Sequence, residues 1–220
     1  MIYITHPDFY LIAKPSGTNM HQEGEAIGLV TQVEALVGEK LFPVHRLDKD
    51  TSGLVILARH AEAAAIFGRL FEQREIDKFY VAVAGNKPAK KQGAIQGDME
   101  KARGGSWRLT KSQQAPAKTW FFSFGTGQGT RLYVLKPLTG RTHQIRVALK
   151  SIGVPILGDS RYKGKPAQRL MLHALALGFT WRGEKLSYLL LPDSDFYPLN
   201  DELTAKLNQP WDLPWPQASV

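Results

Sequence analysis

Residues 44–58 have the sequence Val44-His45-Arg46-Leu47-Asp48-Lys49-Asp50-Thr51-Ser52-Gly53-Leu54-Val55-Ile56-Leu57-Ala58. The first part is polar and predicts a loop, and the apolar run after it predicts a strand buried in the interior. A loop that leads directly into a buried strand is held rigidly, as a catalytic group requires. Asp48 is therefore the first candidate for chemistry. The alternative for a loop aspartate is a turn cap or an ion pair with Arg46.

On either side of this stretch, short strands alternate irregularly with helices. Apolar runs and helical spacing predict, in the first part of the chain, a strand at 10–13, a helix at 28–37 ended by Gly38, a helix at 61–73 and a strand at 78–83. An irregular excursion over 86–116 follows, and then a hairpin of 119–124 and 132–135 around the glycine-rich turn 125–129. The last elements are a helix at 142–152, strands at 170–177 and 186–191, and a short helix. This order indicates an α+β fold with a mixed, mostly antiparallel sheet flanked by helices and loops. The proline-rich tail 210–216 is predicted to form neither helix nor strand, and to pack on the body through its two tryptophans.

The charge of the chain is unevenly distributed. The 28 Lys and Arg exceed the 20 Asp and Glu, a formal charge of +8. Residues 87–118 carry eight basic side chains against Asp98 and Glu100, and residues 131–169 carry nine against Asp159 alone. A surface that is merely solvated mixes its signs, so this clustering favours a groove that faces phosphates. The alternative is a basic balance that serves solubility only.

Cysteine is absent, which excludes disulfides, a thiolate nucleophile and zinc sites that contain cysteine. We expect neither a metal nor an organic cofactor. The N-terminus reaches Asp8 before any long apolar stretch, and no later run is long enough to span a bilayer. A cytoplasmic location is the expectation by elimination.

Six short motifs follow one another along the chain. They are Lys14-Pro15-Ser16-Gly17, the Asp48 stretch, Lys78-Phe79-Tyr80, Gly140-Arg141-Thr142-His143-Gln144-Ile145-Arg146-Val147, the Pro155-Ile156-Leu157-Gly158-Asp159 turn, and Arg169-Leu170-Met171-Leu172-His173-Ala174. In this order and spacing the chain resembles the RluA-type family of RNA pseudouridine synthases over about residues 10 to 178. One departure is Ala148, where the family usually has histidine. We expect that departure to reflect a local change in packing or RNA contact.

The resemblance implies the pseudouridine synthase catalytic fold and an isomerase acting on a structured ribosomal or transfer RNA. It implies Asp48 as the nucleophile, Arg146 as its cationic partner and Tyr80 as the flat side chain that stacks on an extruded uracil. Leu172 would form the opposite wall, and Arg46 would occupy the space left by the flipped base or bind phosphate. The other expected substrate-binding residues support the pocket, and they are His45, Thr51, Arg141, His143 and Gln144. We expect one catalytic domain over 1–220, without a separate RNA-binding extension, acting as a monomer.

The residue types suit this chemistry independently of the resemblance. Converting uridine to pseudouridine breaks the N1–C1′ bond, turns the uracil and rejoins it through C5. A carboxylate can attack the sugar or the ring, or abstract a proton, and the sequence leaves these roles open. A uridine within a stack is out of reach, so it must be extruded against a flat side chain. For Tyr80 the alternative is a core aromatic, and for Arg146 it is a surface or phosphate-binding residue.

Two other functions compete with this interpretation. Asp48-Lys49-Asp50-Thr51 fits the Asp-x-Asp-x-Thr pattern of a magnesium-dependent phosphotransferase. However, Val44-His45-Arg46-Leu47 before it is not a hydrophobic strand, and residues 131–169, where paired acids for the metal would be needed, contain only Asp159. The second alternative is an RNA-binding module without catalysis, which the charge alone supports equally well. Asp48, Tyr80 and Arg146 together favour an enzyme.

Overall fold

The structure is a computed structural model that describes residues 1–85, 88–127 and 129–216. Two positions used above, Lys87 in the first basic run and Gln128 in the glycine-rich turn, lie outside the described residues.

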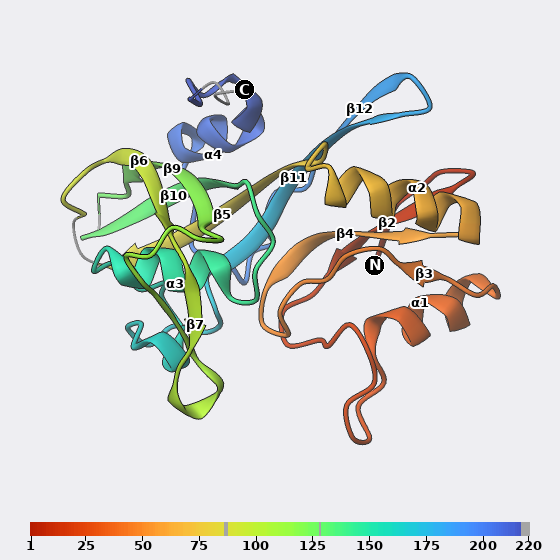
Figure 1. Ribbon diagram of the computed structural model, residues 1–220, viewed down its shortest axis with the longest axis horizontal. Helices are drawn as coiled ribbons and strands as arrows, with labels where there is room; N and C mark the ends of the chain where they lie inside the picture. The colour runs from red at the N-terminus through yellow and green to blue at the C-terminus, as the bar shows by residue number, and fades with distance from the viewer. Residues whose placement is uncertain (86–87, 128, 217–220) are drawn as a thin grey trace.

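A ten-stranded sheet runs through the molecule in the order β1-β2-β4-β11-β5-β10-β9-β6, with β12 paired to β11 and β3 to β4 (Figure 1). Its strands are β1 (Ile2–Thr5), β2 (Phe9–Lys14), β3 (Phe42–Pro43), β4 (Ser52–Ala58), β5 (Asp77–Gly85), β6 (Gln92–Gly97), β9 (Ala117–Gly125), β10 (Thr130–Pro137), β11 (Leu172–Trp181) and β12 (Glu184–Leu189). The helices are α1 (Leu29–Val37), α2 (Ala61–Glu72), α3 (Gln144–Ser151) and α4 (Asp201–Asn208). The predicted α+β class with a mixed, mostly antiparallel sheet is confirmed.

The apolar run that follows Asp48 is buried on both faces. Leu54, Ile56 and Ala58 of β4 pack in the cluster that contains Phe67 of α2, whereas Val55 and Leu57 pack in the cluster under α1. A strand covered by a helix on each side has no face left for polar residues, which explains its continuous apolar sequence. Figure 1 shows α1 and α2 on either side of β4.

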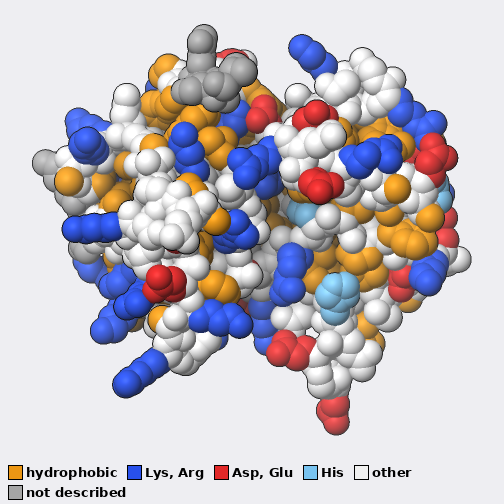
Figure 2. All heavy atoms as spheres, viewed as in Figure 1, with side chains coloured by type: hydrophobic (Ala, Val, Ile, Leu, Met, Phe, Trp, Pro, Cys, Tyr) orange, Lys and Arg blue, Asp and Glu red, His pale blue; other side chains and the backbone are white. Residues whose placement is uncertain are grey.

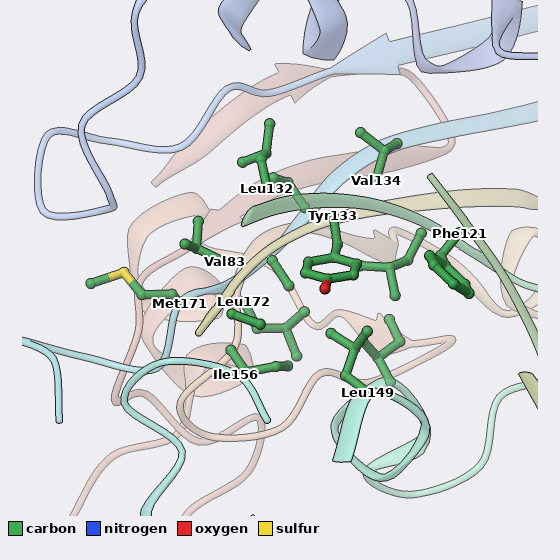
Figure 3. Close-up of a cluster of buried hydrophobic side chains, with 14 of the residues drawn as sticks. Val83, Phe121, Leu132, Tyr133, Val134, Leu149, Ile156, Met171 and Leu172 are labelled. Carbon is green, nitrogen blue, oxygen red and sulfur yellow. The ribbon is translucent and has the colours of Figure 1, made fainter. Parts of the chain in front are cut away.

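A third cluster lies between the sheet and α3. Figure 3 shows the ring of Tyr133, from β10, on the same side of the strand as Phe121 and Leu149, whereas Leu132 and Val134 point to the other side. Tyr80 contacts both this cluster and the one under α1, so it lies where the two halves of the molecule meet.

The half of the molecule that carries α1 and α2 meets the half that carries α3 where β4 pairs with β11; we call this pairing the joint. It is parallel, with Ser52 opposite His173 and Gly53 opposite Ala174. Within the described chain the other strand pairs are antiparallel. Since β5 lies on the other side of β11, this pairing places the residues just after Asp48 one strand away from Leu172 and two strands away from Tyr80.

The expectation of an irregular excursion over 86–116 is wrong. Gln92–Gly97 forms the edge strand β6 against β9, and β7 (Met99–Lys101) and β8 (Trp107–Leu109) form a separate hairpin. These short segments are largely exposed, so they carry no apolar run from which a strand could be predicted. The hairpin contributes to the site described below.

The tail also differs from the prediction at one point. Pro210–Asp212 forms a short 3₁₀ turn, whose first position suits proline because its missing N–H has no partner there in any case. The predicted packing of the tail is confirmed. Trp211 and Trp215 lie against Phe79, with ring centroids 5.8 and 5.9 Å apart, and Trp215 also packs on Phe122.

The joint between β4 and β11 depends on Gly53. Its φ of +113° disfavours any side chain, and a Cβ at this position would lie 2.2 Å from the carbonyl oxygen of Ala174. We expect Gly53→Ala to lower the free energy of unfolding by roughly 3 kcal/mol or more, through strain and loss of the strand pairing.

Gly68 provides the matched control, because a Cβ there meets nothing within 4 Å in the middle of α2. Gly68→Ala should stabilise the protein by roughly 0.5–1 kcal/mol through helix propensity. Urea unfolding of both variants measures the two effects. Equal stability of Gly53→Ala and the wild type would contradict this account of the joint.

Candidate active site

A cleft of about 1220 Å³ opens between the loop before β4, strands β5, β9 and β10, and the start of α3. All ten residues selected from the sequence line it, and they are His45, Arg46, Asp48, Thr51, Tyr80, Arg141, His143, Gln144, Arg146 and Leu172. They come from four separate parts of the chain, so only the folded sheet brings them together.

The loop that carries Asp48 is fixed from behind by a buried lysine. Lys14, at the end of β2, is 2% exposed, and its Nζ donates to the carbonyl oxygens of Lys49 at 2.7 Å, Thr51 at 2.8 Å and Pro15 at 3.1 Å. Burial lowers the pKa of Lys14 to about 8. The sequence analysis noted the motif around Lys14 without assigning this role. The lysine holds the backbone that directly follows Asp48, which limits where the carboxylate can point.

Arg146 is held in place by a second acid. Its Nε and Nη2 donate to the two carboxylate oxygens of Asp159 at 2.8 and 2.9 Å, and Nη1 reaches Asp48 Oδ2 at 3.3 Å. Burial alone would lower the pKa of Arg146, but the hydrogen bonds and charge of Asp159 and the charge of Asp48 outweigh burial and raise it. The guanidinium therefore stays charged, with one N–H group aimed at Asp48. Asp159 was not selected from the sequence, although it is the single acid in a long basic stretch.

Tyr80 and Leu172 form part of the wall beside Asp48. In the register of β5 and β11, Leu172 lies opposite Ala82 and Tyr80 lies opposite Ala174. Both side chains consequently leave the same face of the sheet, one diagonal step apart, which is roughly 7–8 Å between neighbouring positions. Burial and then the charge of Asp48 raise the pKa of Tyr80, so its hydroxyl stays protonated.

Two predicted pocket residues make their hydrogen bonds to the protein itself. His45 Nε2 accepts the backbone N–H of Ile56 at 2.9 Å, and burial lowers the pKa of His45 to about 3. Gln144 accepts from Thr139 Oγ1 and from the backbone N–H of Arg141, and it donates to Thr119 Oγ1 and the carbonyl of Lys118. Both residues hold loops of the cleft through these bonds, and those of Gln144 use both the oxygen and the nitrogen of its amide.

The remaining predicted residues occupy different depths. Thr51 is buried at 3% exposure, and its backbone N–H donates to Asp48 at 3.1 Å. Arg46 and Arg141 are exposed at the mouth of the cleft. Ala148 belongs to the buried face of α3 at 3% exposure and packs in the core cluster, which supports the expected change in packing at this departure from the family pattern.

A further polar network lies behind the cleft, and sequence reasoning missed it. His173 Nε2 faces the carbonyl of Leu190 at 2.9 Å, so this nitrogen carries the proton and Nδ1 accepts from Ser52 Oγ at 2.8 Å. Ser52 Oγ in turn accepts from Arg169 at 2.9 Å. The network ties the first residue of β4 to β11. Only the pairing of these strands reveals it, because its members lie more than 100 residues apart.

The rim of the cleft is basic. Its cations are Arg46, Arg74, Lys78, Lys118, Lys136 and Arg141, while the acids that line it are Asp48, Glu72 and Asp77. In Figure 2, Lys and Arg side chains gather along the boundary between the half of the molecule that carries α3 and the half that carries α1. In the described part of the chain, no three His, Asp or Glu side chains lie close enough together to hold a metal ion. None of the helices within 1–85, 88–127 and 129–216 combines the length and apolar character needed to span a membrane.

The sheet that carries this cleft and its flanking helices have the fold of solved pseudouridylate synthases. The solved structure titled Human RNA Pseudouridylate Synthase Domain Containing 4 superposes with a TM-score of 0.74 over 89% of both chains, at 24% sequence identity. The chain therefore has the fold of that structure.

The sequence comparison identifies the family. Residues 8–151 match the family model described as RNA pseudouridylate synthase, and the chain belongs to this family of isomerases. It is 48% identical over 191 residues to a protein of Haemophilus influenzae named uncharacterized RNA pseudouridine synthase, with 85% of each chain covered. It is 30% identical to a protein of Haemophilus ducreyi named tRNA pseudouridine synthase C, covering 80% of this chain and 84% of that one.

The buried histidines make stability depend on pH. Burial lowers the folded-state pKa of His45 to about 3 and that of His173 to about 4, below the ordinary value of 6.5. The unfolded chain therefore binds more protons between pH 6.5 and 4, and stability falls as the pH drops through that window. At pH 5 each ring should cost at most about 2 kcal/mol relative to pH 7.5.

Thermal melts from pH 7.5 to 4.5, with NMR titration of the imidazole carbons, measure this effect. His45 and His173 should keep their neutral shifts down to pH 5 in the folded protein. A ring of either residue that titrates near pH 6.5 while the protein stays folded would contradict the burial argument.

Proposed function

We propose that this protein isomerises a specific uridine of a ribosomal or transfer RNA to pseudouridine, by extruding the base and using Asp48 as the reacting carboxylate. The observation that carries the proposal is the placement of Asp48, which lines the cleft at 23% side-chain exposure with the charged Arg146 at 3.3 Å. A carboxylate beside a fixed cation stays ionised, as a nucleophile must.

The reaction breaks the bond between uracil N1 and sugar C1′ and forms the bond between C5 and C1′. The C5 proton is lost and a proton is gained at N1, so no atom is added and no oxidant is needed. The Asp48 carboxylate can act at C1′, as in retaining glycosidases, or at the uracil ring, or by abstracting a sugar proton. Each route requires it to be ionised and within reach of an extruded nucleotide, and the geometry of the cleft supports both conditions.

The wall formed by Tyr80 and Leu172 supports the extrusion of the base. Their diagonal spacing leaves room for a flat ring between an aromatic and an aliphatic side chain. Arg46 lies exposed at the mouth of the cleft, where it can fill the gap left in the stack or bind a phosphate. The basic rim suits the phosphates on either side of the extruded nucleotide.

The competing phosphotransferase hypothesis fits the geometry poorly. Its pattern needs Asp48 and Asp50 on one metal ion, but Asp48 lines the main cleft whereas Asp50 lines a separate small hollow with Arg103 and Arg161. Because one continuous sheet runs through the molecule, we propose that residues 1–220 act as one catalytic unit. We also propose that the protein acts in the cytoplasm, where these RNAs are found.

Mapping pseudouridine in total RNA from cells with and without this gene tests the function. One or a few uridines of ribosomal or transfer RNA should lose the modification in the deletion strain and regain it on complementation. An unchanged map, together with no product on any cellular RNA in vitro, would refute the proposal.

Replacing Asp48 should separate catalysis from binding. We expect Asp48→Asn to lower the single-turnover rate by on the order of 1000-fold or more, because the charged carboxylate is lost. RNA affinity should change little, since it arises from many phosphate contacts. The control is Asp50→Asn, which makes the same chemical change two residues away, at a side chain that does not line the cleft. Comparable rates for Asp48→Asn and Asp50→Asn would show that Asp48 is not the reacting group, as for a module that only binds RNA.

Substitutions of Tyr80 distinguish a role in stacking on the extruded base from a role in packing the core. Stacking contributes on the order of 1–3 kcal/mol per base, so Tyr80→Ala should lose about 10- to 100-fold in single-turnover rate with a smaller loss of affinity. Tyr80→Phe keeps the flat ring and should lose at most the contribution of the hydroxyl. Its strand neighbour Phe79 is a core residue at 1% exposure, and Phe79→Ala should cost about 3–5 kcal/mol of stability. If Tyr80→Ala matched Phe79→Ala in melting temperature and its folded fraction turned over normally, Tyr80 would belong to the core alone.

A further inference from the structure

His143 lies between the reacting carboxylate and a tyrosine that the mechanism above does not use. It precedes α3 with a left-handed φ of 57°, which turns its ring toward the cleft. Its Nε2 lies 3.8 Å from Asp48 Oδ2, and its Nδ1 lies 2.8 Å from the hydroxyl oxygen of Tyr162. Tyr162 is buried at 4% exposure within η2 (Ser160–Tyr162), the turn that follows Asp159.

The direction of these hydrogen bonds is determined by the β7–β8 hairpin. The backbone N–H of Trp107 can only donate, and it points at the Tyr162 oxygen at 3.0 Å. The hydroxyl hydrogen of Tyr162 then has His143 Nδ1 as its acceptor among the described residues. Since Nδ1 accepts, the neutral ring carries its proton on Nε2, the nitrogen that faces Asp48.

The same hairpin holds the turn at a second point. Arg161 Nη1, next to Tyr162, donates to the carbonyl oxygen of Gly104 at 2.7 Å. The ring of Tyr162 also lies under the Arg146 guanidinium, 5.1 Å from its centroid. The turn therefore supports both groups that face Asp48, His143 through Tyr162 and Arg146 through Asp159.

Both contacts to the carboxylate involve the same oxygen. Arg146 Nη1 and His143 Nε2 approach Asp48 Oδ2, at 3.3 and 3.8 Å, whereas Oδ1 has no hydrogen-bond partner among the described residues. One oxygen is thus anchored and the other is left for the reaction. Burial lowers the pKa of His143, the positive charges of Arg146 and Arg161 add to this, and the negative charges of Asp48 and Asp159 oppose it. The net lowering agrees with a neutral ring.

We propose that Tyr162 fixes His143 as the Nε2–H tautomer, and that His143 is thereby a positioning residue that orients the Asp48 carboxylate together with Arg146. The effect on turnover rests on the proposed function, whereas the tautomer does not. At 3.8 Å the N–H group acts on Oδ2 across a short gap as an oriented dipole. With the opposite tautomer, a nitrogen lone pair would face the carboxylate and repel it.

The tautomer can be measured without any substrate. Long-range proton–nitrogen NMR spectra of protein labelled with ¹⁵N-histidine distinguish Nε2–H from Nδ1–H and from imidazolium. At pH 7 the wild-type His143 should be the Nε2–H form. Tyr162→Phe removes the donor to Nδ1 and should yield a mixture of forms. A wild-type ring with its proton on Nδ1, or a ring unaffected by Tyr162→Phe, would overturn the assignment.

The catalytic consequence is tested with a matched pair at His143. The amide of His143→Gln can present an N–H near the position of Nε2, whereas His143→Leu cannot. We expect His143→Leu to lose about 10-fold or more in single-turnover rate with unchanged RNA affinity, and His143→Gln to recover most of that loss. Tyr162→Phe should lose about 3- to 10-fold.

Tyr10→Phe is the control, because it also removes a tyrosine hydrogen bond, the 2.7 Å contact to Glu39, but away from the cleft. Its rate should equal that of the wild type. Equal losses in His143→Gln and His143→Leu, or losses that follow the melting temperature, would show a structural role only and overturn the proposal. If the wild type formed no pseudouridine on any RNA, the proposed function would fail, and the NMR result would still decide the role of Tyr162.

Discussion

The site depends on keeping one carboxylate charged and pointing in one direction inside a partly buried cleft. A charge removed from water is costly unless it has a partner, and a free arginine beside it would have many orientations. Asp159 meets both requirements, because its carboxylate accepts from Nε and Nη2 on one edge of the Arg146 guanidinium and leaves Nη1 for Asp48. The turn that carries Asp159 is in turn held by the β7–β8 hairpin. A short segment outside the main sheet thus stabilises the centre of the cleft.

The sheet provides the rigidity that this arrangement needs. β4 is buried between two helices, and Lys14 fixes the loop before it through three carbonyl groups. The parallel step from β4 to β11 places Asp48 near the wall formed by Leu172 and Tyr80. The two halves of the molecule meet at this step, so the wall and the carboxylate belong to one continuous structure. A flipped base held there would meet its reacting group without a large rearrangement.

Several polar residues of the cleft serve the protein and not the ligand. His45, Gln144, Ser52 and His173 make hydrogen bonds to the backbone or to other side chains of the protein. Buried polar groups that are fully paired specify one arrangement of loops. Groups at the rim, such as Arg46, are left exposed for RNA. Some polar side chains thus hold the loops of the cleft, and others at its rim are left to contact RNA. These two roles explain why the cleft has so many polar side chains.

The sequence by itself determined the buried strand after Asp48, the helices around it and the motifs that identify the family, because apolar periodicity and short motifs are local properties. It also selected ten residues that line one cleft. It did not reveal β6 or the β7–β8 hairpin, whose exposed residues lack an apolar run. Only the tertiary structure decided which charges meet. The partners of Arg146 at positions 48 and 159, and the contact of Trp107 with Tyr162, join residues far apart in sequence, and such pairings arise from strand order and register, not from local propensity.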